Sequence, residues 1–122
     1  MRKTLIATVL LFLAAAAPAL AQKAGPNGGF VYEKEGHEAE IVLSPAEIAI
    51  YLSHDGKPNK TEGFSLRVVV QQGGKTTPVT LKDDKGNRFV GSLGAPLEKG
   101  AIVVVTGKDH HGHALTARHV VR

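Results

Sequence analysis

The chain has 122 residues, with fifteen Lys and Arg against eleven Asp and Glu, and it contains no cysteine. Without cysteine the fold can contain no disulfide, so a hydrophobic core must hold it together. The only methionine is Met1, so the soft sulfur ligands that Cu(I) prefers are excluded.

Residues 1–21 are typical of a cleavable export signal. Two basic residues precede an almost unbroken apolar run, and Ala-Leu-Ala at 19–21 has the small-x-small pattern that signal peptidase accepts. The apolar run is shorter than the roughly 20 residues that span a bilayer. We therefore expect cleavage before Gln22, a periplasmic location without stable membrane insertion, and a single domain over 22–122.

That segment holds two of the basic residues, which leaves thirteen basic and eleven acidic side chains, a net charge near +2. The whole-chain charge of +4 therefore overstates how basic the exported part is. Because the charges are spread along the sequence without a basic stripe, they argue against a nucleic-acid partner.

Short alternating or apolar runs then recur, separated by Gly, Asn and Pro. Ile48, Ile50 and Leu52 alternate with their neighbours at a period of two, which indicates a strand. Pro78 places the fifth run at a sheet edge or bulge. Seven or eight strands without helical periodicity predict an all-β fold: an antiparallel, immunoglobulin-like β-sandwich, with a partly closed barrel as the alternative. The predicted strands are 29–33, 37–43, 47–53, 64–72, 76–82, 88–92, 101–108 and 113–121.

Three of the six histidines fall within four positions, in the sequence HHGH. If His111 and Gly112 form a two-residue hairpin loop, His110 and His113 face each other directly across two strands. That pair could bind one divalent metal ion, with His111 as a replacement ligand. Asp109 would then point to the opposite face, so we do not count it as a ligand. Histidine is unusual at the first turn position, so a longer loop is the alternative.

The other histidines lie in different settings. His54 begins an HDGKP turn and His37 begins a strand after an EKEG turn. Either is an exposed turn residue, or a third ligand if its loop shares an end of the sandwich with HHGH. His119 lies some 20 Å along the strand from His113, among apolar neighbours, so we expect a core or sheet-edge histidine with a satisfied hydrogen bond and no ligand. Two or three imidazoles suit Cu(II), Zn(II), Ni(II) or Co(II), and an open site should bind the ion weakly.

Catalytic signatures are missing from the sequence. No serine lies in a G-x-S-x-G elbow, and no phosphate loop, dinucleotide fingerprint or haem motif occurs. Glu38 and Glu40 share one strand face, but a solvated face explains them as well as a catalytic pair does. We therefore predict that the protein is not an enzyme.

Three segments carry a family resemblance: GPNGG at 25–29, GHEAEIVL at 36–43 and IAIYLSHDGKP at 48–58. They are similar to small exported bacterial β-domains, found alone or at the N-terminal end of periplasmic adaptor subunits of heavy-metal efflux systems. Asn27 stands where many such domains have histidine, and Ser53 where an acidic residue is common. The resemblance implies a periplasmic β-sandwich associated with metal handling and no catalysis.

These observations together predict a periplasmic protein that weakly binds a divalent transition metal and serves metal efflux or homeostasis. Its partners would be metal efflux components or another envelope protein. The alternative is an envelope protein-interaction module that docks through loops or the strand containing Pro78, with incidental histidines. A third hypothesis is a pH-sensing surface, because histidine titrates near pH 6.5.

Overall fold

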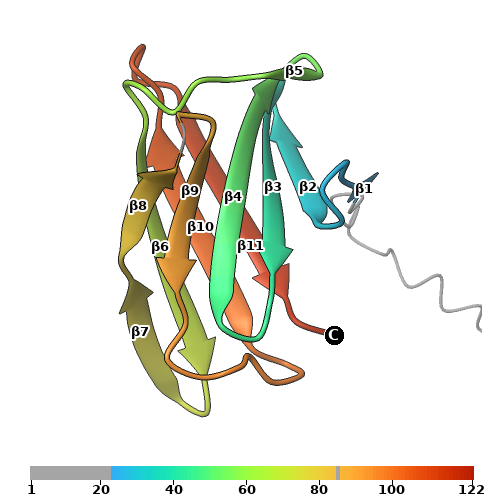
Figure 1. The fold of residues 1–122 in the computed structure, drawn as a ribbon, viewed down its shortest axis with the longest axis vertical. Helices are drawn as coiled ribbons and strands as arrows, with labels where there is room; N and C mark the ends of the chain where they lie inside the picture. Colours follow the sequence, from blue (N-terminus) through green and yellow to red (C-terminus); the bar gives the residue numbers. More distant parts are fainter. Residues whose placement is uncertain (1–22, 85) are drawn as a thin grey trace, which may run out of the picture.

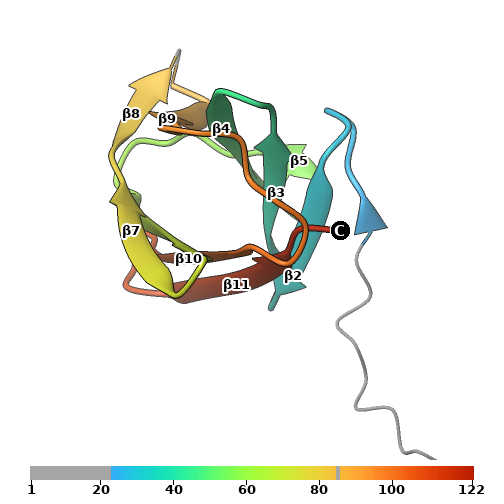
Figure 2. The same cartoon turned by 90° about the horizontal axis from the view of Figure 1, so that it is seen from below.

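The computed structural model describes residues 23–84 and 86–122 as two antiparallel sheets packed face to face (Figures 1 and 2). The predicted all-β sandwich is confirmed. The expected export signal lies outside the described residues. Within the described residues, no helix is long and apolar enough to cross a membrane.

The first sheet has seven strands in the order β1-β2-β3-β4-β9-β8, and β5 pairs with β4 away from this path. The neighbouring strands are antiparallel throughout. The strands are β1 (Lys23–Ala24), β2 (Phe30–Lys34), β3 (His37–Leu43), β4 (Glu47–His54), β5 (Lys57–Pro58), β8 (Leu81–Asp84) and β9 (Arg88–Ser92).

The second sheet has four strands in the order β11-β10-β6-β7, also antiparallel. They are β6 (Ser65–Gln72), β7 (Lys75–Val79), β10 (Ile102–Lys108) and β11 (Ala114–Val120). All eight predicted strands are present. The structure adds the two-residue strands β1 and β5 and divides the fifth predicted run into β7 and β8.

Because the run is divided, one continuous stretch of chain contributes a strand to each sheet. β7 pairs with β6 in the second sheet, whereas β8 pairs with β9 in the first, so they join the sheets along one side (Figure 2). A Cβ atom at Gly91 in β9 would lie 2.5 Å from Val79 Cγ1 and 3.0 Å from the Thr80 carbonyl oxygen, so glycine permits this close approach. Pro78 lies in β7, an edge strand, as predicted.

The core lies between the sheets. Alternating positions face inward: on β10, Val103 and Val105 are fully buried between more exposed neighbours. Each buried aliphatic side chain of this kind contributes roughly 1.5–3 kcal/mol through the hydrophobic effect. The largest fully buried side chains come equally from the two sheets: Ile41, Ile48, Ile50, Val68, Val103 and Val105.

On the side opposite the β7–β8 crossover, β2 and β11 meet through a buried histidine. His119 is only 3% exposed, and its Nδ1 lies 2.7 Å from the Tyr32 hydroxyl. The Phe30 ring stacks on its imidazole with 4.5 Å between centroids. The predicted hydrogen bond of His119 is therefore confirmed, and of the two predicted settings, core or sheet edge, the structure shows the core. Burial lowers its pKa from 6.5, and the nearby charge of Arg122 lowers the pKa further.

Glu40 corrects the expectation of a solvated strand face. It is 4% exposed and lies beneath the loop between β1 and β2. Its carboxylate accepts hydrogen bonds from the Asn27 amide nitrogen at 2.9 Å, the Asn27 side-chain nitrogen at 2.9 Å and the Gly29 amide nitrogen at 2.8 Å. A buried charge is tolerated when it is fully hydrogen-bonded, so the GPNGG segment surrounds Glu40.

Replacing Glu40 by Gln should lower the free energy of unfolding by about 1–3 kcal/mol, because the amide has one acceptor oxygen and sets an NH2 group against the donors of the loop. Urea unfolding measures the change. Glu33→Gln, at an exposed position on β2, is the matched control and should change stability by less than about 0.5 kcal/mol. Equal effects of the two substitutions would contradict the role of Glu40.

Stability should fall as the pH is lowered from 6.5 toward the depressed folded-state pKa of His119. In that window the unfolded chain binds a proton that the folded protein does not, so acid favours unfolding. Below the folded-state pKa the effect levels off. Denaturant unfolding at several pH values should give a smaller slope for His119→Gln than for the wild type. Identical slopes would show that His119 is not the responsible group.

Candidate metal centre

Three hairpins bring histidines to one end of the sandwich. The β2–β3 turn at Glu35-Gly36 and the β4–β5 turn at Asp55-Gly56 each have positive φ at both central residues, which suits tight hairpin turns. In the β3–β4 pairing, His37 lies directly opposite His54. The β10–β11 loop reaches the same end from the other sheet (Figure 1).

The β10–β11 loop is the longer loop that was the alternative to the two-residue turn. The last ladder pair is Lys108 with Ala114, and the Asp109 amide then donates to the His113 carbonyl at 3.1 Å. The Gly112 amide donates to the Asp109 carbonyl at 3.0 Å, and Gly112 has φ of 80°. This is a three-residue loop, in which a left-handed glycine follows a turn. Asp109, and not His110, therefore faces His113, and the predicted register is wrong.

The Asp109 carboxylate holds this loop together. Its Oδ1 accepts hydrogen bonds from the backbone amides of His111 at 2.9 Å and His113 at 2.8 Å. Its Oδ2 lies 3.0 Å from His113 Nδ1. Only 4% of the Asp109 side chain is exposed. Because Oδ1 is engaged by backbone, Oδ2 remains for side-chain partners.

The pKa of Asp109 is lowered from 3.8. Burial opposes this shift, but the hydrogen bonds from the amide and ring of His113 and from the amide of His111 outweigh it. A carboxyl group with a depressed folded-state pKa stabilises the fold above pH 3.8 and loses that contribution as the pH falls through the folded value. Asp109 is therefore a carboxylate at neutral pH, as a metal ligand must be.

His37 approaches the same carboxylate oxygen from the first sheet. Its Nε2 lies 3.7 Å from Asp109 Oδ2, and its side chain is 19% exposed. The His54 ring stacks on the His37 ring, with 4.5 Å between centroids and 8° between planes. His54 thereby restricts the orientation of the His37 imidazole.

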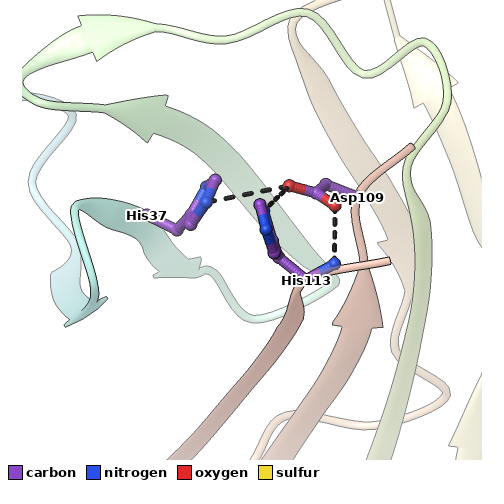
Figure 3. Close-up of side chains that lie close together, drawn as sticks. All are labelled: His37, Asp109 and His113. Atoms are coloured by element: carbon purple, nitrogen blue, oxygen red, sulfur yellow. Dashed lines mark hydrogen bonds and ion pairs between the residues drawn. The ribbon is translucent and has the colours of Figure 1, made fainter. Parts of the chain in front are cut away.

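His37, Asp109 and His113 form the metal-competent group (Figure 3). One ligand atom from each lies within 4.8 Å of the other two. Two ligands bound at the usual 2.0–2.2 Å in a tetrahedral site are about 3.3–3.5 Å apart. The distances of 3.0 and 3.7 Å from Asp109 Oδ2 to the two imidazoles bracket that value. Small side-chain movements would therefore bring all three onto one ion.

The other predicted ligands lie outside this group. His110 and His111 contact each other at the tip, with 3.9 Å between ring centroids, and both are exposed. His110 also lies against Gly63, where a Cβ atom would come 2.7 Å from the His110 Cβ. His54 stacks on the His37 ring, and its Nε2 lies 3.5 Å from Asp55 Oδ2. Of the five histidines named from the sequence, only His37 and His113 belong to the metal-competent group.

Asp109 is a candidate ligand that the sequence did not predict. The signal was present in the tetrapeptide DHHG, because type I turns favour aspartate at the first position and glycine at the fourth. That pattern indicates the three-residue loop and places Asp109 opposite His113. A tighter loop was chosen instead because glycine also suits two-residue turns.

Comparisons with protein-family models, curated proteins and solved structures found no match for this chain. The candidate site therefore rests on the chemistry and geometry of its own residues.

Asp109→Ala and Asp109→Asn should affect the loop differently. Alanine removes the carboxylate oxygen that accepts both amides, so the His111 and His113 amides should exchange with solvent at least about tenfold faster. Asparagine keeps one oxygen for the two amides, so their protection should persist. Hydrogen exchange followed by NMR measures both. Fast exchange in the two variants alike would show that the loop needs the charge as well as the acceptor geometry.

Proposed function

We propose that this protein is a periplasmic, non-enzymatic binder of a divalent transition-metal ion, held by His37, Asp109 and His113. The observation that carries the proposal is the convergence of two imidazoles on one carboxylate oxygen. Imidazole nitrogen with carboxylate oxygen suits Zn(II), Cu(II), Ni(II) or Co(II). With three protein ligands, a fourth position is left for water or a donor from another molecule.

The exposure of the three ligands supports a role in which the metal ion exchanges with solvent or with a partner. Asp109 is buried, whereas 58% of the His113 side chain is exposed. His113 also lies beside a loop tip that carries two further imidazoles, His110 and His111. An ion held this way is accessible from solvent, and the tip histidines offer transient ligands on its path. Such a site buffers the ion or passes it to a partner.

A role in metal efflux or homeostasis follows from combining this site with the sequence. The resemblance of residues 25–58 to exported metal-handling domains and the predicted export signal support an envelope location. His37 falls within that stretch, whereas Asp109 and His113 do not. The partner in this proposal is an efflux component that accepts the ion.

A protein-interaction module remains the alternative function, and one observation favours it. β7 is an edge strand with one free side, and a groove beside it is lined by apolar side chains that include Pro78, Val79 and Leu97. A partner docked there would bind with the same affinity with or without metal, and its binding would persist in chelator.

Thermal unfolding of untagged protein in chelator, and then with each of the four metals, tests metal binding. An ion at 100 times its dissociation constant should stabilise the fold by about 2.7 kcal/mol. Asp109→Asn and His113→Gln should each raise the dissociation constant at least about 100-fold, since each removes one of three ligands. Asp109→Asn gives the clearer test, because asparagine keeps the oxygen that accepts the two loop amides and so removes the ligand without removing the loop's hydrogen bonds.

His110→Gln is the matched control, because it removes a histidine from the same loop but outside the metal-competent group. It should retain the metal-induced shift. A shift lost in His110→Gln and kept in Asp109→Asn would assign the ion to the tip histidines instead. No shift with any metal would remove the metal function altogether.

A further inference from the structure

Charge is divided unequally between the two sheets. The four strands of the second sheet contain no Asp or Glu, and they carry Arg67, Lys75, Lys108 and Arg118. The strands of the first sheet balance five basic residues (Lys23, Lys34, Lys57, Lys82 and Arg88) against six carboxylates: Glu33, Glu38, Glu40, Glu47, Asp83 and Asp84. A net charge near +2 for residues 22–122 therefore conceals a strongly cationic second sheet.

Three of these cations project from the outer face of the second sheet. Arg67, Lys108 and Arg118 are exposed, on β6, β10 and β11, and each has less exposed, inward-facing neighbours along its strand. The register spreads them over three successive rows: Lys108 opposite Ser65, Arg67 opposite Thr106, and Arg118 opposite Val104. We call these three cations with the exposed hydroxyl groups of Thr106 and Thr116 the basic face.

No ion pair in the described part of the chain engages the basic face. Among the described residues, every ion pair involves other side chains, and the one that uses an arginine joins Arg88 to Asp84 in the first sheet. The three cations are thus free to contact an external anion. Like-charged groups on one face favour a partner that spreads negative charge over a surface.

We propose that the basic face docks the protein on the surface of an anionic phospholipid bilayer. Arginine and lysine bind phosphate, arginine with two parallel hydrogen bonds, and the threonine hydroxyl groups add donors between them. Each basic residue near an anionic bilayer strengthens binding roughly fivefold. The three together give reversible, salt-sensitive adsorption without insertion into the membrane.

The size and composition of the basic face favour a bilayer over other anionic partners. The three cations lie on three adjacent strands and span four residue steps, about 10 Å by 13 Å, a footprint well below the roughly 800 Å² per partner of a stable protein interface. It offers no aromatic side chain to anchor a protein or to stack on nucleic-acid bases. The one large exposed hydrophobic residue of the described part, Phe30, belongs to β2 in the other sheet.

This inference does not depend on the metal proposal. The basic face covers the second sheet, whereas the metal-competent group lies at the end of the sandwich, beyond Lys108 and Ala114. When the protein is adsorbed through its second sheet, the metal-competent group lies at the edge of the area in contact with the bilayer. The two properties can therefore fail separately in experiments.

Sedimentation of residues 22–122, which contain the whole described fold, with phosphatidylcholine vesicles with and without phosphatidylglycerol tests the proposal. Binding should require phosphatidylglycerol and disappear as salt rises from about 0.1 M to about 1 M, where the Debye length shrinks from about 10 Å to about 3 Å. Arg67→Gln with Arg118→Gln should weaken partitioning about 30-fold. Thermal unfolding of this double variant checks that it is folded.

Lys23→Gln with Lys82→Gln is the matched control, since it removes the same charge from exposed positions in the first sheet. It should retain vesicle binding. Equal losses in the two double variants would trace binding to net charge and overturn the basic face. Absence of phosphatidylglycerol-dependent binding would overturn the proposal, and capture by polyglutamate without vesicle binding would assign the face to an acidic protein.

Discussion

The candidate site depends on one buried carboxylate with two differently used oxygens. Asp109 Oδ1 accepts two backbone amides and fixes the β10–β11 loop, which leaves Oδ2 facing His113 and His37. If both oxygens were used by the backbone, the loop would still carry its histidines. No carboxylate oxygen would then be left between the imidazoles of the two sheets. Local turn chemistry therefore supplies the ligand geometry.

The rest of the architecture delivers His37 to that oxygen. The tight turns before β3 and after β4 place His37 opposite His54, and stacking on His54 restricts the imidazole. The sheets are held at this spacing by the apolar core, by the β7–β8 crossover on one side, and by the contact of His119 with Tyr32 on the other. The site is thus rigid on the β3 side and open at the loop tip.

The sandwich also separates chemical features by location. Its end gathers histidines around the Asp109 carboxylate, the strands of its first sheet carry six further carboxylates, and its second sheet presents a cationic outer face. A metal-handling protein held at an anionic surface would stay where exported ions pass, with its site at the rim. The two proposals are compatible because a strand exposes one face to solvent while the other packs into the core.

The sequence by itself determined the fold class and most strand positions, and it limited Pro78 to a sheet edge or bulge and His119 to the core or a sheet edge, because alternation and turn residues act locally. It also indicated where histidine gathers. Only the tertiary structure decided that His37 joins His113, that Asp109 lies between them and that Glu40 is buried. Those facts depend on which hairpins share an end of the sandwich and on a one-residue register. A shift of one residue reverses every side chain on a strand, and contacts between sheets leave no periodic trace along the chain.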